Sequence, residues 1–320
     1  MVMNWNEKEI LITGGTGSLG KILTKLLLDK KPPKGIRIFS RDELKQWEMR
    51  NELNKLYPNA PVSFLVGDVR DYNRLELACE GVNILIHAAA LKQVPSCEDN
   101  PLEAIQTNIN GATNILYSSL ENKVEKVLGI SSDKAVYPIN LYGATKMCAE
   151  KLFIQGNTYS GNRVPHFSCC RYGNVIGSRG SIVPLFKKQF AETGKITITD
   201  KHMTRFWITL NQVSNFILQA IEDMEGEEIF IPIMPSATVL TMAKAICPNA
   251  EIEFIGIRAG EKLHESLITK EESVRTTINK IKNRFEIRAN GIFPSDEFEY
   301  RSDNNNWWIN AEQIKKMISE

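Results

Sequence analysis

The stretch Glu9-Ile-Leu-Ile-Thr-Gly-Gly-Thr-Gly-Ser-Leu-Gly20 decides the fold of this chain. Residues 9–13 predict a short buried strand, and residues 21–28 continue with the apolar spacing of a helix. The glycines at positions 14, 17 and 20 permit a tight turn, and they let a pyrophosphate approach a helix N-terminus, where free N–H groups favour anions. This strand–turn–helix context favours a dinucleotide site over a simple βα turn.

Further strands and helices alternate outward from this unit. Strands are expected at 35–40, 62–68, 83–88, 126–131 and 165–171, with helices at 41–56, 71–79, 101–120 and 142–159. The strands are apolar throughout, which is typical of parallel strands that helices cover on both faces. We therefore predict an α/β fold, a Rossmann-like doubly wound parallel sheet with a smaller C-terminal α/β substrate lobe.

The regular alternation fades after residue 173, which suggests how the domains are divided. We assign residues 1–173 to the dinucleotide-binding domain, with a return segment at about 206–234 that is expected to be helical over 206–224. Residues 174–205 and 235–320 are assigned to the substrate lobe. Pro, Gly and Arg are prominent where this lobe begins.

Composition and charge exclude several classes of function. The chain has 320 residues, 42% of them hydrophobic and 24% charged, and a net charge of +1. These values are ordinary for a globular protein and give no global basic field for nucleic acid. The six cysteines show no C-x-x-C spacing, and with the four histidines they form no metal-ligand pattern. We expect no metal.

The apolar runs are too short for a bilayer. The longest, residues 82–91, is interrupted by Asn83 and His87 and falls far short of the roughly 20 residues of a membrane helix. The N-terminus has no apolar signal region. The sequence thus predicts a cytoplasmic protein without a membrane span.

Residues at the ends of the predicted strands indicate which dinucleotide binds. Ser40 and Arg41 stand where a site for the free ribose diol usually has an acidic residue, and Arg41 can pair with a 2′-phosphate. This favours NADP, although the nearby Asp42 leaves NAD open. Asp68 suits a contact to the adenine edge. The expected cofactor-binding residues are Gly14, Thr16, Gly17, Ser18, Leu19, Gly20, Ser40, Arg41, Asp68, Val69, Ala88, Ala89, Ala90, Tyr142 and Lys146.

Two acid/base pairs lie close together in the sequence. Tyr142 and Lys146 are four residues apart and share a helix face, so the ammonium is expected to favour the phenolate. Asp133 and Lys134 supply a second acid and base. Hydride transfer alone does not need this second pair, whereas dehydration of a sugar nucleotide does.

Longer stretches carry a family resemblance. They are His87-Ala-Ala-Ala-Leu-Lys92, Ser132-Asp-Lys-Ala135, Tyr142-Gly-Ala-Thr-Lys146, Arg171-Tyr-Gly-Asn-Val-Ile-Gly-Ser-Arg-Gly180 and Met203-Thr-Arg-Phe-Trp-Ile-Thr-Leu210. With the glycine pattern they resemble extended short-chain dehydrogenase/reductases. They are most similar to the inverting UDP-N-acetylglucosamine (UDP-GlcNAc) 4,6-dehydratases of pseudaminic acid biosynthesis.

The resemblance implies a role for each catalytic candidate. Tyr142 takes the C4 hydroxyl proton while hydride passes to NADP, Lys146 orients the nicotinamide ribose, and Ser132 binds the same hydroxyl. Lys134 removes the C5 proton and Asp133 protonates the departing C6 hydroxyl. Hydride returns to C6, and C5 is inverted. Retaining relatives have Met where this chain has Tyr142.

The resemblance also implies a UDP-GlcNAc site and a homo-oligomer, either a dimer or a hexamer. Arg258 is expected to clamp the diphosphate and Glu261 to bind the uridine ribose. Structural salt bridges remain an alternative for Arg179 and Arg205. The substrate candidates are Lys92, Asn174, Arg179, Ser181, Arg205, Arg258 and Glu261.

Three other functions remain open at this point. They are a retaining 4,6-dehydratase, a sugar-nucleotide epimerase or reductase, and a dinucleotide sensor that has no catalytic activity.

Overall fold

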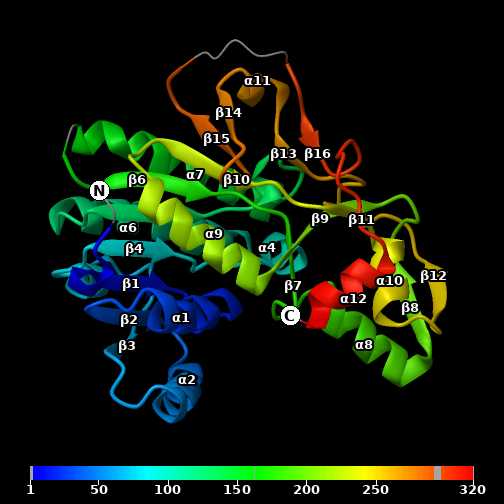
Figure 1. The fold of residues 1–320 in the computed structure, drawn as a ribbon, viewed down its shortest axis with the longest axis horizontal. Coiled ribbons are helices and arrows are strands. Elements are labelled where there is room, and N and C mark those ends of the chain that lie inside the picture. Colours follow the sequence, from blue (N-terminus) through cyan, green and yellow to red (C-terminus); the bar gives the residue numbers. More distant parts are fainter. Residues whose placement is uncertain (1–2, 162, 292–296, 320) are drawn as a thin grey trace.

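Strand β1 (Glu9–Thr13) lies inside a large sheet, between the strands β2 and β4. The computed structural model describes residues 3–161, 163–291 and 297–319 (Figure 1). The sheet has the order β14-β15-β10-β6-β5-β4-β1-β2-β3, and all pairings from β10 to β3 are parallel. Its other strands are β2 (Gly35–Ser40), β3 (Val62–Val66), β4 (Ile84–His87), β5 (Lys126–Ile130), β6 (His166–Cys170), β10 (Glu228–Pro232), β14 (Thr276–Asn279) and β15 (Arg284–Arg288).

Alternate residues of the strands enter two separate cores, one on each face of the sheet. In β1, Ile10 and Ile12 belong to one core and Leu11 to the other. Helices α1 (Ser18–Lys30), α2 (Glu43–Leu56) and α9 (Leu210–Asp223) pack into the first core. Helices α3 (Tyr72–Cys79), α6 (Gly111–Glu121) and α7 (Leu141–Ser160) pack into the second. This arrangement explains the wholly apolar strands and confirms the predicted Rossmann-like doubly wound fold.

The connection between β4 and α6 is helical but irregular. It consists of α4 (Val94–Asp99), α5 (Pro101–Ile105) and a π-helical segment, Gln106–Asn110, which continues into α6. The single helix predicted at 101–120 is therefore a helix with a wide turn inside it. Such turns are frequent at functional sites.

The remaining elements form the smaller lobe, seen at the right and top of Figure 1. Its helices are α8 (Ile182–Thr193), α10 (Val239–Ile246), α11 (Lys270–Ser273) and α12 (Ala311–Ser319). Three small sheets accompany them. These join β7 (Asn174–Ile176), β9 (Thr204–Thr209) and β11 (Ser236–Thr238); β8 (Lys195–Ile198) and β12 (Glu251–Phe254); and β13 (Ser266–Ile268) and β16 (Tyr300–Arg301).

Two segments differ from the sequence expectation. Residues 206–209, expected in a helix, continue the buried strand β9, because Thr209 instead caps α9 through a reciprocal capping box with Gln212. The hairpin β14–β15 was expected in the substrate lobe, but it extends the main sheet with antiparallel strands. The division at residues 173, 205 and 234 otherwise stays a prediction.

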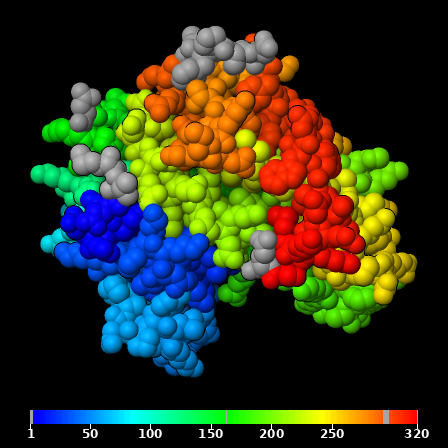
Figure 2. Space-filling model, in the orientation of Figure 1, coloured from blue at the N-terminus to red at the C-terminus, as the bar shows by residue number. Residues whose placement is uncertain are grey.

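A hollow separates the N-terminal part of the molecule from the smaller lobe at the lower edge of Figure 2. In the described parts of the chain, no helix has the length and apolar character needed to cross a membrane.

Candidate active site

The glycine loop after β1 is shaped by contacts with the backbone after β4. Gly14 has a φ of +66°, and a Cβ placed on it would lie 2.8 Å from the Cα of Ala89. A Cβ on Gly20 would lie 2.3 Å from the carbonyl oxygen of Gly15. These contacts leave no room for larger residues, and they bring the first turn of α1 against the loop. The loop therefore presents the N-terminus of a long helix to the space beside Ala88–Ala90.

That space is a cavity of about 1000 Å³. Its volume lies at the upper end of the range for small-molecule sites. It is lined by the following predicted site residues: Gly14, Thr16, Gly17, Ser18, Leu19, Gly20, Ser40, Arg41, Asp68, Val69, Ala88, Ala89, Ala90, Lys92, Ser132, Asp133, Lys134, Tyr142, Lys146, Asn174, Arg179 and Ser181. The structure thus brings the predicted cofactor and catalytic residues together.

The end of the cavity beside β2 and β3 carries several charges. The Asp68 carboxylate accepts from Arg70 Nη2 at 2.7 Å and lies 3.7 Å from Arg41 Nη1. Burial acts to raise the pKa of Asp68, but the hydrogen bonds from Arg70 outweigh it and the pKa is lowered. Asp68 is thus ionised, and Arg41, whose side chain is 52% exposed, remains available for a further anion.

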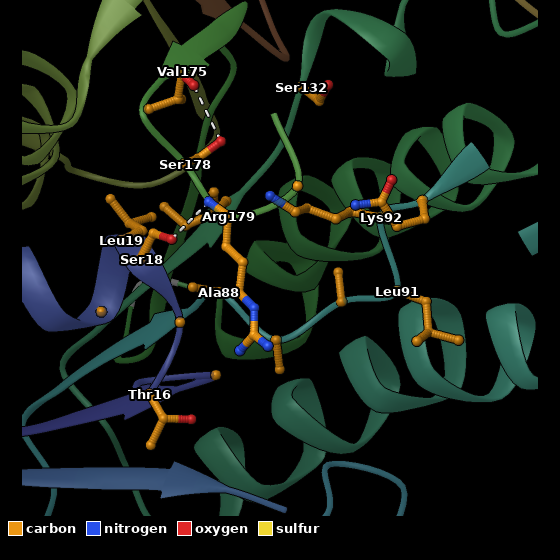
Figure 3. A pocket seen from close by; sticks show the side chains of 18 of the residues that line it. Thr16, Ser18, Leu19, Ala88, Leu91, Lys92, Ser132, Val175, Ser178 and Arg179 are labelled. Atoms are coloured by element: carbon orange, nitrogen blue, oxygen red, sulfur yellow. Dashed lines mark hydrogen bonds between the residues drawn. The ribbon is translucent and has the colours of Figure 1, made fainter. Parts of the chain in front are cut away.

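Lys92 and Arg179 reach toward the cavity from opposite sides (Figure 3). The Arg179 backbone N–H donates to Ser18 Oγ at 3.0 Å, which ties the loop after β7 to the start of α1. The pKa of Asp42 is lowered chiefly by its hydrogen bonds with Lys45 and to a smaller extent by the charge of Arg179. The Arg179 guanidinium thus lies near enough to Asp42 to affect it, and the expected contact of Arg179 with the substrate stays a prediction.

Asp133 and Lys134 form an ion pair in the 3-10 turn that follows β5, Asp133–Ala135. Lys134 Nζ lies 3.1 Å from Asp133 Oδ1, which also accepts from Ser132 Oγ at 2.9 Å. Asp133 is 1% exposed, and its burial raises the pKa of the carboxyl. Burial acts to lower the pKa of Lys134, but Asp133 and Glu265 outweigh it and raise the pKa. Lys134 is therefore an ammonium.

Helix α7 packs closely against this turn because Gly143 has no side chain. A Cβ on Gly143 would lie 2.2 Å from the carbonyl oxygen of Lys134, so the helix backbone rests directly on the turn. Asn140 caps the helix by accepting from the Gly143 N–H at 2.7 Å. Tyr142, which directly precedes Gly143, is thereby held beside Asp133 and Lys134.

The pKa of Tyr142 does not follow the expectation drawn from its spacing with Lys146. The Lys146 ammonium donates to the carbonyl of Ile130 at 2.5 Å. Burial raises the pKa of Tyr142, and the opposing effects of Lys134 and Ser132 are smaller. The phenol is thus protonated in this state, contrary to the expectation that Lys146 would favour the phenolate, because the cost of burying a charge is larger.

Three predicted substrate residues lie outside the described lining of the cavity. Arg205 is buried and donates to the carbonyls of Thr204, Lys262 and Leu263. The Arg258 side chain is 53% exposed and lies 4.0 Å from Glu261 Oε1. The loop that carries Arg258 and Glu261 contacts the start of α7, because Asn140 Nδ2 donates to the Gly260 carbonyl at 2.8 Å. The expected contacts of Arg205, Arg258 and Glu261 with the substrate stay predictions.

Sequence reasoning missed two buried polar residues near the site. Asn108, in the π-helical segment, binds the backbone of Leu91 in both directions and donates to Thr145 Oγ1 at 2.9 Å. Glu265 lies 3.4 Å from Lys134 Nζ. Neither residue carries a signal in the sequence, because Asn108 lies in the largely polar stretch 106–114 and nothing local distinguishes Glu265 from other charged residues.

The comparisons with known proteins identify the family. The polysaccharide biosynthesis protein family matches residues 10–286. The "UDP-N-acetylglucosamine 4,6-dehydratase (inverting)" of Campylobacter jejuni is 46% identical, and the match covers 98% of each chain. The chain belongs to the polysaccharide biosynthesis family of extended short-chain dehydrogenase/reductases.

Some similar proteins are named for a different activity. A "UDP-glucose 4-epimerase" of Rickettsia bellii is 41% identical over 98% of this chain and 95% of its own. Among solved structures, Pen from Bacillus thuringiensis has a TM-score of 0.92 with 38% identity, covering 99% of this chain and 98% of that chain. The family therefore includes relatives named for dehydration and for epimerisation, and the residues of the site must separate the two.

Proposed function

We propose that this protein is an NADP-dependent hydro-lyase that converts UDP-GlcNAc to a UDP-4-keto-6-deoxy sugar with inversion at C5. The observation that carries the proposal is that Asp133 and Lys134 face the same cavity as Tyr142, Lys146 and the glycine loop. One cavity thus holds an acid/base pair for oxidation at C4 and a second pair for loss of water. The similarity to dehydratases over almost the whole chain supports it.

The residues around the cavity fit a nicotinamide dinucleotide. The helix N-terminus at Gly17–Ser18 suits the pyrophosphate, and the small side chains of Ala88–Ala90 leave space beside it. When bound, the cofactor accepts a hydride from the sugar and later returns it. Arg41 favours NADP over NAD, because its exposed guanidinium can pair with a 2′-phosphate.

The ion pair becomes an acid and a base by moving one proton. Transfer from Lys134 Nζ to Asp133 Oδ1, over 3.1 Å, gives a neutral amine and a neutral carboxylic acid. Tyr142 and Ser132 bind the C4 hydroxyl. Tyr142 first releases its phenol proton to solvent, and the phenolate then takes the C4 hydroxyl proton as the ketone forms. Lys134 then removes the C5 proton, and Asp133 gives its proton to the C6 oxygen, which leaves as water. The charged pair is thereby restored. A solvent proton added to C5 from the opposite face gives the inverted product and replaces the proton that Tyr142 released, so the protons balance.

Several finer assignments rest on the sequence resemblance alone. We extend the proposal to the first step of a pseudaminic-acid-type pathway, to a homo-oligomer and to a cytoplasmic location. Lys92, Asn174, Arg179 and Ser181 are proposed to bind the sugar nucleotide, because they line the same cavity as Asp133 and Lys134.

Epimerisation at C4 is the second candidate, since epimerases are among the similar proteins. It shares the oxidation step at Tyr142 but requires no acid for a departing hydroxyl. The buried position of Asp133 next to Lys134 therefore favours dehydration.

Incubation of the protein with UDP-GlcNAc, followed by mass spectrometry, tests the proposal. We expect a product that has lost one water, and in heavy water we expect deuterium and an inverted configuration at C5 by NMR. A product of unchanged mass with an altered configuration at C4 would indicate an epimerase. A product that has lost water but retains the C5 configuration would indicate a retaining dehydratase. Absence of turnover with every UDP-sugar tested would favour a dinucleotide sensor.

A further inference from the structure

Glu265 is a buried carboxylate that the proposed chemistry does not yet use. It lies in the smaller lobe just before β13 and is 2% exposed. Its backbone is fixed by two hydrogen bonds with Ser302: the Glu265 N–H donates to Ser302 Oγ at 3.0 Å, and its carbonyl accepts from the Ser302 N–H at 2.8 Å. The segment that carries the carboxylate is thus well anchored.

Three cations surround the Glu265 carboxylate. Oε1 lies 3.4 Å from Lys134 Nζ and 3.8 Å from Arg205 Nε, and Oε2 lies 3.4 Å from Lys262 Nζ. Within the described chain, Oε2 has no hydrogen-bond partner that meets ordinary geometry. A buried carboxylate is costly unless it is paired, so these cations keep Glu265 ionised.

Lys134 consequently lies between two carboxylates from different parts of the chain. Asp133 Oδ1 is 3.1 Å from its ammonium nitrogen, and Glu265 Oε1 is 3.4 Å from the same atom. A lysine side chain is long and flexible, and a single partner leaves it free to rotate. Two partners fix the ammonium against the wall of the cavity, where the side chain is still 25% exposed.

We propose that Glu265 is a positioning residue for Lys134: from the smaller lobe it holds the ε-amino group beside Asp133 and sets how readily that group gives up its proton. The proposal deepens the proposed function and rests on it for the role of Lys134 as the base.

The electrostatics around Lys134 give the direction of the effect. Glu265 stabilises the ammonium, so removing its charge lowers the pKa of Lys134 and increases the fraction of free amine. Removing the charge of Lys262 raises the pKa of Lys134. With one cation fewer beside it, the Glu265 carboxylate stabilises the Lys134 ammonium more strongly. The charged and titratable groups that face Lys134 or its partner carboxylate are Asp133, Tyr142, Arg205, Lys262 and Glu265.

The test measures the pKa of Lys134 through its reactivity. The full-length protein is acetylated with acetic anhydride over a series of alkaline pH values. Peptide mass spectrometry gives the acetylation rates of Lys134 and of the exposed Lys201 in the same sample. The measured quantity is the ratio of the Lys134 rate to the Lys201 rate. We expect Glu265→Gln to raise this ratio about tenfold, which corresponds to a pKa lower by one unit. Lys262→Met should decrease the ratio. Glu253→Gln, an exposed glutamate in β12, serves as the control and should leave it unchanged.

Each outcome bears on the proposal. An unchanged ratio in Glu265→Gln, or an increase in Lys262→Met, would overturn it. If Glu265→Gln fails to fold, as judged by circular dichroism, the decrease in Lys262→Met decides alone. The labelling requires no turnover, so a shifted ratio in a protein that removes no water from UDP-GlcNAc would reject the dehydratase and leave the link between Glu265 and Lys134 intact.

Discussion

The two ends of the cavity are encoded in different ways. The nucleotide end is built largely from one continuous stretch, Gly14–Gly20, and its neighbours in the sheet. The catalytic end gathers Lys134, Arg205, Lys262 and Glu265 from segments far apart in the chain. A short motif suffices to recognise the first, whereas the chemistry of the second depends on how the smaller lobe packs on the sheet.

The largest effect is expected at the catalytic end, from Lys134→Met. The substitution keeps an unbranched side chain but removes the amine, and loss of a general base typically lowers a rate by ~10²–10⁴-fold. Loss of water from UDP-GlcNAc, followed by mass spectrometry, should fall accordingly, while NADPH binding measured by fluorescence stays unchanged. Lys201→Met is the control. If the two ends were coupled, cofactor binding would fall as well.

The connection between the lobe and the sheet can be tested with Arg171→Met. The buried Arg171 binds Glu150 of α7 at 2.6 Å and Glu272 of α11 at 2.9 Å. Without it two carboxylates lose their partner, which costs about 3–5 kcal/mol. Urea unfolding should show a lower free energy of unfolding, with Arg288→Met, at an exposed position, as the control. If the unfolding free energy falls no further than in Arg288→Met, the lobe does not depend on the triad of Glu150, Arg171 and Glu272.

The same triad predicts a pH dependence. Burial acts to raise the pKa of Glu272, but Arg171 outweighs it and the pKa is lowered. A lowered folded pKa contributes stability above the unfolded value, about 4.3, and this contribution is lost as the pH falls through the folded pKa. The difference in unfolding free energy between wild type and Glu272→Gln should therefore be largest near neutral pH and shrink in acid. A difference that is constant with pH would contradict the ion pair.

The smallest effect is expected at the nucleotide end, from Arg41→Ala. Its guanidinium is half exposed, and ion pairs at such positions contribute about 0.2–1 kcal/mol. Affinity for NADP should fall by the corresponding few-fold, whereas affinity for NAD should not fall. Isothermal titration of both cofactors measures this, with Arg50→Ala, an exposed residue of α2 outside the described cavity lining, as the control. Equal losses for both cofactors would remove the preference for NADP.

Sequence reasoning succeeded where information is local. It predicted the glycine loop, the alternation of apolar strands and helices, and the family, all of which are confirmed. It assigned residues 206–209 to a helix because a wholly buried strand such as β9 lacks the alternation that distinguishes strands. It could not find Glu265, whose significance comes from three cations contributed by other segments. It also overestimated the effect of Lys146, since burial is not visible in spacing.

The absence of a side chain at position 143 has a consequence for redesign. Because Gly143 rests on the carbonyl of Lys134, the start of α7 is packed directly against the turn Asp133–Ala135. If Tyr142 is replaced to alter the stereochemical outcome of the proposed reaction, Asp133 and Lys134 should keep their positions as long as Gly143 is retained. A library that randomises positions 142 and 143 together is expected to lose most of its active members through substitutions of Gly143.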